Sequence, residues 1–556
     1  MKKLFLIILI IIGFIPLLGL FHSGLPITHD GKDHVARIAN FYQNLQEGNL
    51  IPRWAGNLNW GYGHPILEFL YPLPSYIASV SHLIGFSFID SAKIVFGIGM
   101  LASAVGMYLW LGEFLPIPAA FIGGVIYLFT PYRFVEVYVR GDIGENLAFV
   151  FMPLTLLFIY RLYKKGKDSG PARMTICLTA ISFASLMLSH NAIVLMYFPF
   201  IIFYCLYLSY MSKDKFYMLR TTCYSLLLGF ALSAFFWVPA LLEGKYTLRN
   251  IVTAGEYTSR YVSFPQLLYG PWSFGGTGQF SVQLGIINWI VLFTSVCIVF
   301  ILWKKKDKNF LLTISLLLYT MAAIFLMLPL SQGIWQKIML LQNFQFPWRF
   351  LAIPLFTTSV LGAIIVSLIP KPFYKFVIFL LLLLILFFNK DYWHAKGYLY
   401  HSDQFFSAVY NSTTDTGESS PIWSVRFMEK QPKKHVEVIA GKAMVTPLQR
   451  NMTKHVYAVT AITEAGLREN TIYFPGWEVL QDGKEIPIQY QDPHNRGIIT
   501  FSVAKGRHMI TVVYTETKLR LVADVISLLS LLSVVIVLSV TYVTKNPLLR
   551  YNKENQ

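Results

Sequence analysis

Many long runs of apolar residues divide this chain, and they constrain its fold more than any other feature. Several reach the roughly 20 residues that a helix needs to cross a bilayer, from 4–20 near the start to 521–543 near the end. The composition agrees, because 55% of the 556 residues are hydrophobic and only 13% are charged, about half the charged fraction of an ordinary soluble domain. The sequence therefore excludes a soluble enzyme and predicts a polytopic α-helical membrane protein.

Basic segments lie between the apolar runs, at 161–173, 213–220, 304–308, 371–375 and 545–553. The cytoplasmic loops of membrane proteins carry such an excess of Lys and Arg. This pattern accounts for most of the formal net charge of +17, so the charge predicts no nucleic-acid partner. With these clusters in the cytoplasm, the sequence predicts about 12 transmembrane helices in the cell membrane of a bacterium, with both termini cytoplasmic. The expected spans are approximately 4–21, 91–111, 117–132, 145–163, 173–190, 192–211, 221–240, 284–303, 310–330, 350–369, 373–389 and 520–543.

Three parts are expected along the chain: a transmembrane core over 1–389, an extracytoplasmic β-rich domain over 390–518, and a last transmembrane helix with a cytoplasmic tail over 519–556. The apolar stretch 65–85 is left out of the spans because it holds three prolines and because counting it would place the basic cluster 304–308 outside. We expect it to form helices at the membrane surface. The outer loops are then 22–90, 133–144, 241–283 and 331–349.

The block 390–518 changes from continuous apolar runs to alternating apolar and polar residues, as in 455–460 and 498–503. Such alternation has the period of a half-buried strand. Asp482-Gly483 lies between two further runs and is a strong hairpin turn signal. The sequence therefore predicts a small β-sandwich that is tethered by spans at both ends.

The first outer loop opens with an acid, an imidazole and a cation at helical spacing. Asp30, His34 and Arg37 stand at i, i+4 and i+7, which places them on one face of a helix that starts near Asp30. Gly48 supplies a stop for that helix. A purely structural role is the alternative for Asp30, since aspartate is a favoured N-cap residue.

The second outer loop carries Arg140, Asp142 and Glu145 between two spans. Ionisable groups near membrane depth are costly and usually face a partner or a polar cavity. A local ion pair that only fixes the loop is the alternative. His190 follows the fifth span and Arg349 precedes the tenth; the alternatives for these two are a packing histidine and an interfacial anchor.

Motifs of several other chemistries are absent from the sequence. It has no Gly-rich phosphate loop with Lys-Ser/Thr, no Gly-x-Ser-x-Gly nucleophile elbow and no His-Glu-x-x-His. The candidate chemistry therefore rests on the carboxyl, imidazole and guanidinium groups of the outer loops.

Several short motifs occur in order along the chain: Asp30-x-x-x-His34-x-x-Arg37, Pro52-Arg53-Trp54, Gly61-Tyr62-Gly63-x-Pro65, Tyr71-Pro72-Leu73, Arg140-Gly141-x-x-x-Glu145, His190-Asn191 and Phe346-Pro347-Trp348-Arg349. Together they resemble bacterial multi-pass proteins of the GT-C glycosyltransferase superfamily. The nearest branches are the YfhO-like proteins and the membrane proteins labelled "6-pyruvoyl-tetrahydropterin synthase-related", a label that implies no pterin chemistry. The resemblance covers the span region to residue 389, and the stretch 473–484 also resembles YfhO-like chains.

The resemblance implies an outer-face glycosyltransferase that takes a sugar from a polyprenyl-phosphate-linked donor. A cytoplasmic-face polyprenyl-phosphate glycosyltransferase would supply this donor. The acceptor would be a cell-envelope glycan such as teichoic acid. The family's catalytic carboxylate follows the first span, and the matching residue here is Asp30. A second acid would be Asp142 or Glu145. The expected substrate-binding residues are His34, Arg37, Arg140, His190 and Arg349, of which Arg140 and Arg349 suit the phosphate.

A metal site is not assigned, because the chain lacks the Asp-x-Asp of metal-dependent members, although a divalent metal stays open. Two other functions also stay open. A transporter or flippase of lipid-linked sugars would more often show inverted repeats and charges near mid-span. A non-catalytic envelope assembly protein would use the β-rich domain as its working part.

Overall fold

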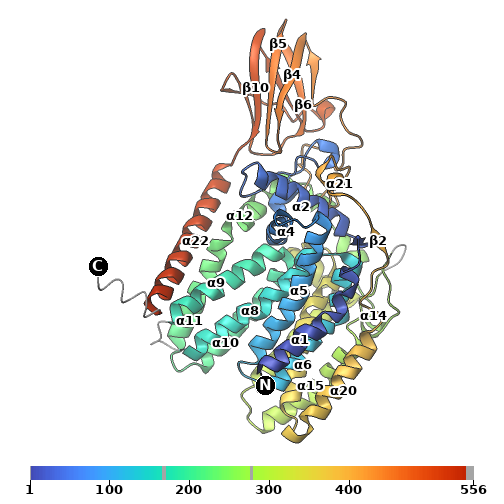
Figure 1. Cartoon of the computed structure of the whole chain (residues 1–556), viewed down its shortest axis with the longest axis vertical. Helices are drawn as coiled ribbons and strands as arrows, with labels where there is room; N and C mark the ends of the chain where they lie inside the picture. Colours follow the sequence, from blue (N-terminus) through green and yellow to red (C-terminus); the bar gives the residue numbers. More distant parts are fainter. Residues whose placement is uncertain (1, 166–170, 276–279, 546–556) are drawn as a thin grey trace.

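The computed structural model describes residues 2–165, 171–275 and 280–545. A helical bundle makes up most of the molecule, and a β-domain projects from one end of it (Figure 1). The start of α1 (Lys2–Gly13) and the far end of α22 (Lys518–Lys545) lie at the opposite end of the bundle (Figure 1). The end that carries the β-domain is called the β-domain end below.

The bundle consists of helices with the length and composition of membrane spans. The described residues contain 10 such helices, or up to 12 if each of two bent pairs is one span. This agrees with the number expected from the sequence, and the stretch 65–85 is not among the spans. The unbent spanning helices are α1, α5 (Phe88–Leu111), α8 (Ile143–Lys165), α9 (Pro171–Ser189), α10 (Asn191–Met211), α15 (Ile286–Lys304), α16 (Phe310–Met327), α19 (Ala352–Ser367), α20 (Tyr374–Asn389) and α22.

The two bent pairs both break near the β-domain end. In the first pair, α6 (Ile117–Phe129) is followed at 47° by α7 (Pro131–Phe134) and the π-helical turn η3 (Val135–Arg140). In the second pair, α11 (Lys215–Leu232) is followed at 70° by α12 (Ala234–Leu242). The segment 133–144, expected as an outer loop, is helical as far as Arg140. Pro131 begins a new helix because its missing N–H costs nothing at that position.

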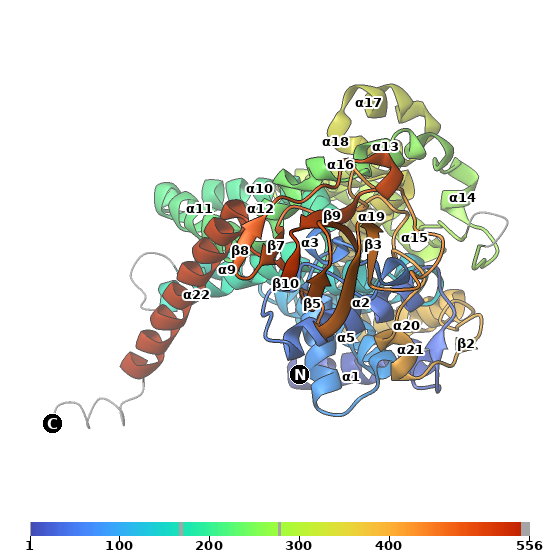
Figure 2. The same cartoon turned by 90° about the horizontal axis from the view of Figure 1, so that it is seen from above.

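Shorter helices and turns cover the β-domain end of the bundle. The helices are α2 (Gly31–Gln46), α3 (Ile66–Phe69), α4 (Leu73–Leu83), α13 (Arg249–Val252), α14 (Phe264–Leu268), α17 (Gln332–Lys337), α18 (Met339–Gln342) and α21 (Asp403–Ser407). The helix expected to start near Asp30 is confirmed as α2, and Gly48 follows its end with a φ of 91°. Seen from above, α22 lies on one side of the molecule and α17 and α18 on the other (Figure 2).

The β-domain is built from two antiparallel sheets. Five strands pair in the order β4-β5-β10-β7-β8 and three in the order β3-β6-β9. The inward side chains of both sheets form a separate hydrophobic core. The strands are β3 (Val436–Ala440), β4 (Ala443–Arg450), β5 (Lys454–Ala461), β6 (Ala465–Ile472), β7 (Trp477–Gln481), β8 (Lys484–Ile486), β9 (Ile498–Val503) and β10 (Gly506–Tyr514).

The predicted hairpin at Asp482-Gly483 is confirmed, since these two residues join β7 to β8 with φ values of 52° and 82°. The two sheets occupy only part of the block 390–518, from Val436 to Tyr514. Residues 390–435 carry only α21 and the short strand β2 (Tyr398–Leu399), which pairs with β1 (Leu25–Pro26). This segment runs beside the short helices instead: the carbonyl of Ser407 and the carboxylate of Asp403 accept from Asn57 and Phe88, and Tyr410 donates to Asp33.

Ion pairs connect α22 to the bundle and to the segment that precedes its helices. Nη2 of Arg520 lies 2.9 Å from Glu68 and 2.5 Å from Glu243. Nη2 of Arg53 lies 2.6 Å from Asp524 of α22. Removing one partner of such a buried pair is strongly destabilising, so these contacts fix the last helix against the segments that precede it.

Candidate functional site

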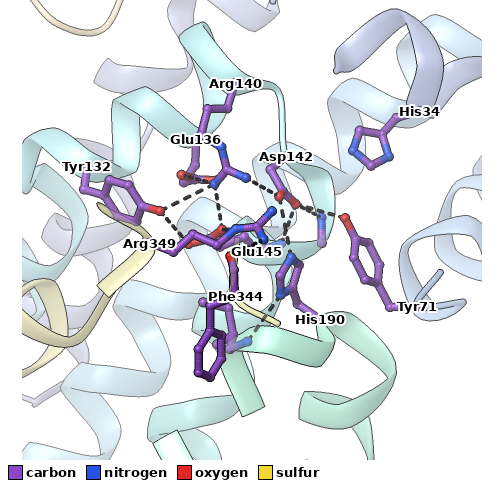
Figure 3. Close-up of polar contacts among 12 residues, drawn as sticks. His34, Tyr71, Tyr132, Glu136, Arg140, Asp142, Glu145, His190, Phe344 and Arg349 are labelled. Carbon is purple, nitrogen blue, oxygen red and sulfur yellow. Dashed lines mark hydrogen bonds and ion pairs between the residues drawn. The ribbon is translucent and has the colours of Figure 1, made fainter. Parts of the chain in front are cut away.

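A cavity of about 1420 Å³ opens at the β-domain end of the bundle. Seven of the eight site residues predicted from the sequence line it: Asp30, His34, Arg37, Arg140, Asp142, His190 and Arg349. The eighth, Glu145, lies behind this surface and has no exposed area. Segments far apart in the sequence therefore form one polar site (Figure 3).

Backbone contacts place Asp30 beside Arg140. The N–H groups of His29 and Asp30 donate to the carbonyls of Val139 (2.9 Å) and Arg140 (2.8 Å). Gly141 permits this approach, because its φ is 71° and a Cβ there would meet Thr28 Oγ1 at 2.2 Å. The start of α2 is thereby tied to the end of η3.

Asp30 is the N-cap residue of α2, but its side chain makes no capping hydrogen bond. The hydroxyl of Thr28 accepts from the N–H of Gly31 instead, at 3.0 Å. The carboxylate of Asp30 is left to face the cavity. Burial raises the pKa of Asp30 above its ordinary value, and the opposing effects of Arg140 and Arg37 do not cancel this. The helix-cap alternative is thus not what the side chain does here.

His34 and Arg37 lie on the same face of α2 as Asp30, as the spacing predicted. Nη1 of Arg37 lies 3.3 Å from Nδ1 of His34. Burial and the charge of Arg37 lower the pKa of His34 to about 3, so its imidazole is neutral. Arg37 also donates to the side chain of Thr414 at 3.0 Å and to its carbonyl. It therefore joins the helix to the segment that precedes the β-domain.

Arg140 is the centre of a buried ion cluster (Figure 3). Its Nη1 lies 2.7 Å from Glu136 and 2.7 Å from Glu145, and its Nη2 lies 2.9 Å from Asp142. The side chain is 4% exposed. These contacts occupy the guanidinium, so the prediction that Arg140 clamps a phosphate does not agree with its geometry. The sequence reasoning missed Glu136 because it placed this residue in a loop, whereas in a helix it pairs with Arg140 at i, i+4.

Asp142 is held by several donors at once. Its Oδ1 accepts from Tyr71 Oη at 3.0 Å and from the N–H groups of Gly144 and Glu145. Burial raises the pKa of this carboxyl, but His190 and Arg140 outweigh burial and hold the pKa well below its usual range. Asp142 is therefore a stable anion and a poor base. Glu145 is equally committed, since its Oε1 accepts from Tyr132 Oη at 2.7 Å.

Arg349 is a cation beside the cluster whose N–H donors are not all used in hydrogen bonds among the described residues. Its Nη1 donates to the carbonyl of Phe344 at 3.3 Å, and its Nε lies 3.9 Å from Glu145 without a hydrogen bond. The guanidinium also lies over the ring of Phe346, 5.1 Å from its centroid. Arg349 is thus oriented toward the cavity by its neighbours.

Asp142, Glu145 and His190 have possible metal-ligand atoms within 4.8 Å of one another. Both carboxylates already accept from Arg140. Nδ1 of His190 accepts from the N–H of Ile193 at 3.3 Å, so Nε2, the nitrogen that faces Asp142 at 3.6 Å, is the one that carries a proton. The donor set as arranged does not fit a metal ion.

The model of the 6-pyruvoyl-tetrahydropterin synthase related domain, described as a membrane protein, matches residues 67–395 of this chain. The chain belongs to this family. The match includes both broken helices and the ion cluster, and it ends before the β-domain. Family membership agrees with the resemblance noted from the sequence motifs.

The chain is also similar to one other protein in sequence and to solved structures in fold. An uncharacterised protein of Lactococcus lactis subsp. cremoris (strain MG1363) is 24% identical over 253 residues, which are 44% of this chain and 40% of that protein. The chain thus matches about two fifths of the length of that relative. Among solved structures, the apo oligosaccharyltransferase of Archaeoglobus fulgidus gives a TM-score of 0.44 at 13% identity, covering 76% of this chain and 61% of that one. The arabinofuranosyltransferase AftD from Mycobacteria gives 0.39 at 14% identity, covering 71% and 27%. Neither similarity assigns a role to a residue of this chain.

Proposed function

We propose that this protein is a membrane glycosyltransferase that moves a sugar from a polyprenyl-phosphate-linked donor to a hydroxyl of a cell-envelope acceptor. One observation carries the proposal: Asp30, a carboxylate with a raised pKa, faces a large cavity and accepts no hydrogen bond from the residues that the structure describes. A general base works best when its pKa approaches the working pH. The resemblance of the motifs to GT-C glycosyltransferases points to the same residue.

The donor's lipid tail is suited to the apolar wall of the cavity. This wall is formed by Met187, Leu195, Phe230, Trp237 and Leu241, from α9 to α12. Leu195 is 45% exposed and Leu241 is 69% exposed, on surfaces of spanning helices. An apolar surface that continues from the cavity to the outside of the bundle would let a polyprenyl chain stay in the bilayer while its head group enters the site.

The donor's phosphate would be held by cations at the mouth of the cavity. Lys245, Arg249, Arg260 and Arg349 line it, and the first three have no carboxylate within 4 Å in the described part of the chain. A lipid phosphate leaves with the electron pair of the bond to the sugar, so it needs positive charge more than a proton. Arg349 is the phosphate ligand nearest to the ion cluster.

In the proposed reaction, an acceptor hydroxyl attacks the anomeric carbon of the donor sugar. The new bond to carbon forms as the bond to the phosphate oxygen breaks, and the hydroxyl proton passes to Asp30. Arg140, Asp142, Glu145 and Glu136 act as a rigid support, because their charges are paired with one another. A positioned base of this kind contributes about 100-fold to 10,000-fold.

The proposed orientation follows the charges at the two ends of the bundle. The basic clusters 213–220 and 304–308 lie where α10 and α15 end, at the opposite ends of these helices from the cavity, and the first cluster continues into the start of α11. By the positive-inside tendency, that end is cytoplasmic. The cavity and the β-domain would then face outward, toward teichoic acid or another surface glycan. A reporter fusion after His455 that reads as cytoplasmic would contradict this orientation.

The decisive experiment compares Asp30→Asn with Asp33→Asn. Asparagine keeps the size of the side chain and is itself a favoured N-cap residue, so Asp30→Asn should fold and insert normally. Cells with Asp30→Asn should accumulate sugar-loaded polyprenyl phosphate and lack the sugar on the acceptor. Asp33, whose carboxylate accepts from Tyr410 Oη at 3.0 Å, should tolerate the same change far better. Wild-type turnover by purified Asp30→Asn would refute the proposal.

A further inference from the structure

A hydroxyl-rich loop from the segment before the β-domain forms part of the cavity wall. Thr414, Asp415, Thr416, Glu418 and Ser419 all line the cavity that also contains Asp30. None of them was predicted from the sequence. The loop lies beyond the family match, which ends at residue 395, so it is a feature of this chain next to a site that the family region supplies.

The loop is held in a defined shape. Thr414 has a φ of 69°, which is rare for a β-branched residue, and Arg37 holds it by two hydrogen bonds. The carboxylate of Asp415 accepts from the N–H of Gly417 at 2.9 Å and of Ser419 at 3.0 Å. Because Arg37 shares a helix face with Asp30, the loop and the proposed base are positioned by the same helix.

Asp415 is a permanent anion of this loop. Nε2 of the buried His64 lies 3.4 Å from its Oδ1. Burial raises the pKa of Asp415, but His64 and Ser419 outweigh burial and lower the pKa below its usual range. The loop therefore lines the cavity with carboxylate and hydroxyl groups, while Arg37 donates to Thr414 and Nε of Arg426 donates to the carbonyl of Thr416.

Two polar groups of the loop have unused hydrogen-bonding capacity. Ser419 is 1% exposed, and its hydroxyl, which interacts with Asp415, makes no hydrogen bond of ordinary geometry among the described residues, so its hydrogen-bonding capacity is only partly used. Glu418 uses Oε2 to accept from Gln345 at 3.2 Å and Thr416 at 2.8 Å. Its Oε1 has no partner in the described part of the chain. A buried polar group whose hydrogen-bonding capacity is only partly used is costly unless a ligand completes it.

We propose that the loop Thr414–Ser419 is the subsite that binds the hydroxyl groups of the acceptor sugar. This rests on the proposed function and deepens it. Carboxylates bind sugar hydroxyls as strong acceptors, whereas they repel a phosphate. The donor phosphate and the acceptor sugar would thus be separated by charge, with the phosphate at Arg349, Arg249 and Arg260 and the sugar at Glu418 and Ser419.

The test measures sugar binding to the full-length protein in detergent by saturation-transfer NMR. The probes are the methyl glycosides of glucose, galactose, mannose and N-acetylglucosamine. At least one glycoside should bind the wild type. Glu418→Gln and Ser419→Ala should each raise its Kd, and the increase for Glu418→Gln, which removes the charged partner, should be about tenfold or more. The matched controls Glu429→Gln and Ser402→Ala lie on the same segment but outside the cavity lining, and should bind as wild type.

The outcomes separate this inference from the proposed function. If no glycoside binds the wild type, or if binding survives both loop substitutions, the inference is overturned. Asp30→Asn should still bind the glycoside, because only the base is removed. Retained turnover in Asp30→Asn, combined with lost glycoside binding in the loop variants, would refute the proposed reaction but support the sugar-binding role of the loop.

Discussion

Nη1 of Arg140 lies 2.7 Å from Oε2 of Glu145, and both side chains are buried. The same nitrogen also contacts Glu136, and Nη2 contacts Asp142. Three carboxylates thus converge on one cation, and Arg349 approaches the group at 3.9 Å. Arg140 is therefore a structural centre for the charges behind the cavity, whereas a phosphate would have to displace one of its carboxylates.

Replacing Arg140 by Gln should destabilise the protein by about 3–5 kcal/mol, because it leaves buried carboxylates without their cation. Thermal unfolding of the detergent-purified protein would measure the loss. Adding Glu136→Gln to Arg140→Gln should recover part of it, since the second change removes one uncompensated charge. An unchanged unfolding temperature in Arg140→Gln would contradict this account of the cluster.

Arg349→Lys should affect activity and leave stability nearly unchanged. Lysine keeps the charge but loses the planar fork of donors that matches a phosphate. The expected result is a loss of about tenfold or more in kcat/KM for the lipid-linked sugar. Arg220→Lys, at the opposite end of the bundle, is the control. If Arg349→Lys and Arg349→Ala both keep wild-type kinetics, Arg349 is only an anchor.

Chelation of divalent metals should change neither the unfolding temperature nor sugar transfer. His190 uses Nδ1 to accept from Ile193, so its Nε2 carries the proton and cannot ligate a cation in this arrangement. The measurement is unfolding of the purified protein with EDTA and with added Mn²⁺ or Mg²⁺. A metal-dependent rise in unfolding temperature that His190→Ala abolishes would show that the cluster rearranges to bind metal.

The sequence predicted the architecture well because length and apolarity are local properties. The spans, the β-rich block and the Asp482-Gly483 hairpin each follow from a pattern within a short window. The start of α2 at Gly31 follows from residue types in the same way. The helical turn within 133–144 was not predicted, because the sequence analysis took this segment as a loop and did not consider that Glu136 and Arg140 pair at helical spacing.

The rest of the site depends on contacts that no local pattern records. Tyr71 reaches Asp142 from a segment 71 residues away, and Thr414 reaches Arg37 across 377 residues. The hydroxyl-rich stretch 412–420 could have been noticed as unusual before a β-rich block. The position of this stretch beside Asp30 could not have been predicted, because it is set by tertiary packing.

The last prediction concerns the pH dependence that Asp30 confers. Its pKa is raised in the folded protein above the ordinary value of 3.8, so ionising it costs folding free energy. Asp30→Asn should therefore unfold at a higher temperature than wild type at pH 7. The difference should shrink as the pH falls through the raised pKa, because wild-type Asp30 then becomes protonated and neutral as well.

Ionisation of Asp30, which lowers the stability of the folded protein, should be required for its activity. The base must be ionised to accept a proton, so wild-type kcat/KM should fall on acidification at a pH above the ordinary aspartate range. Asp30→Asn should have a much lower rate without this acid limb, and Asp33→Asn should keep the limb. Unfolding temperatures and pH–rate profiles of the three proteins would check both parts. If Asp30→Asn is no more stable than wild type at pH 7 and keeps the acid limb, then Asp30 is not the titrating base.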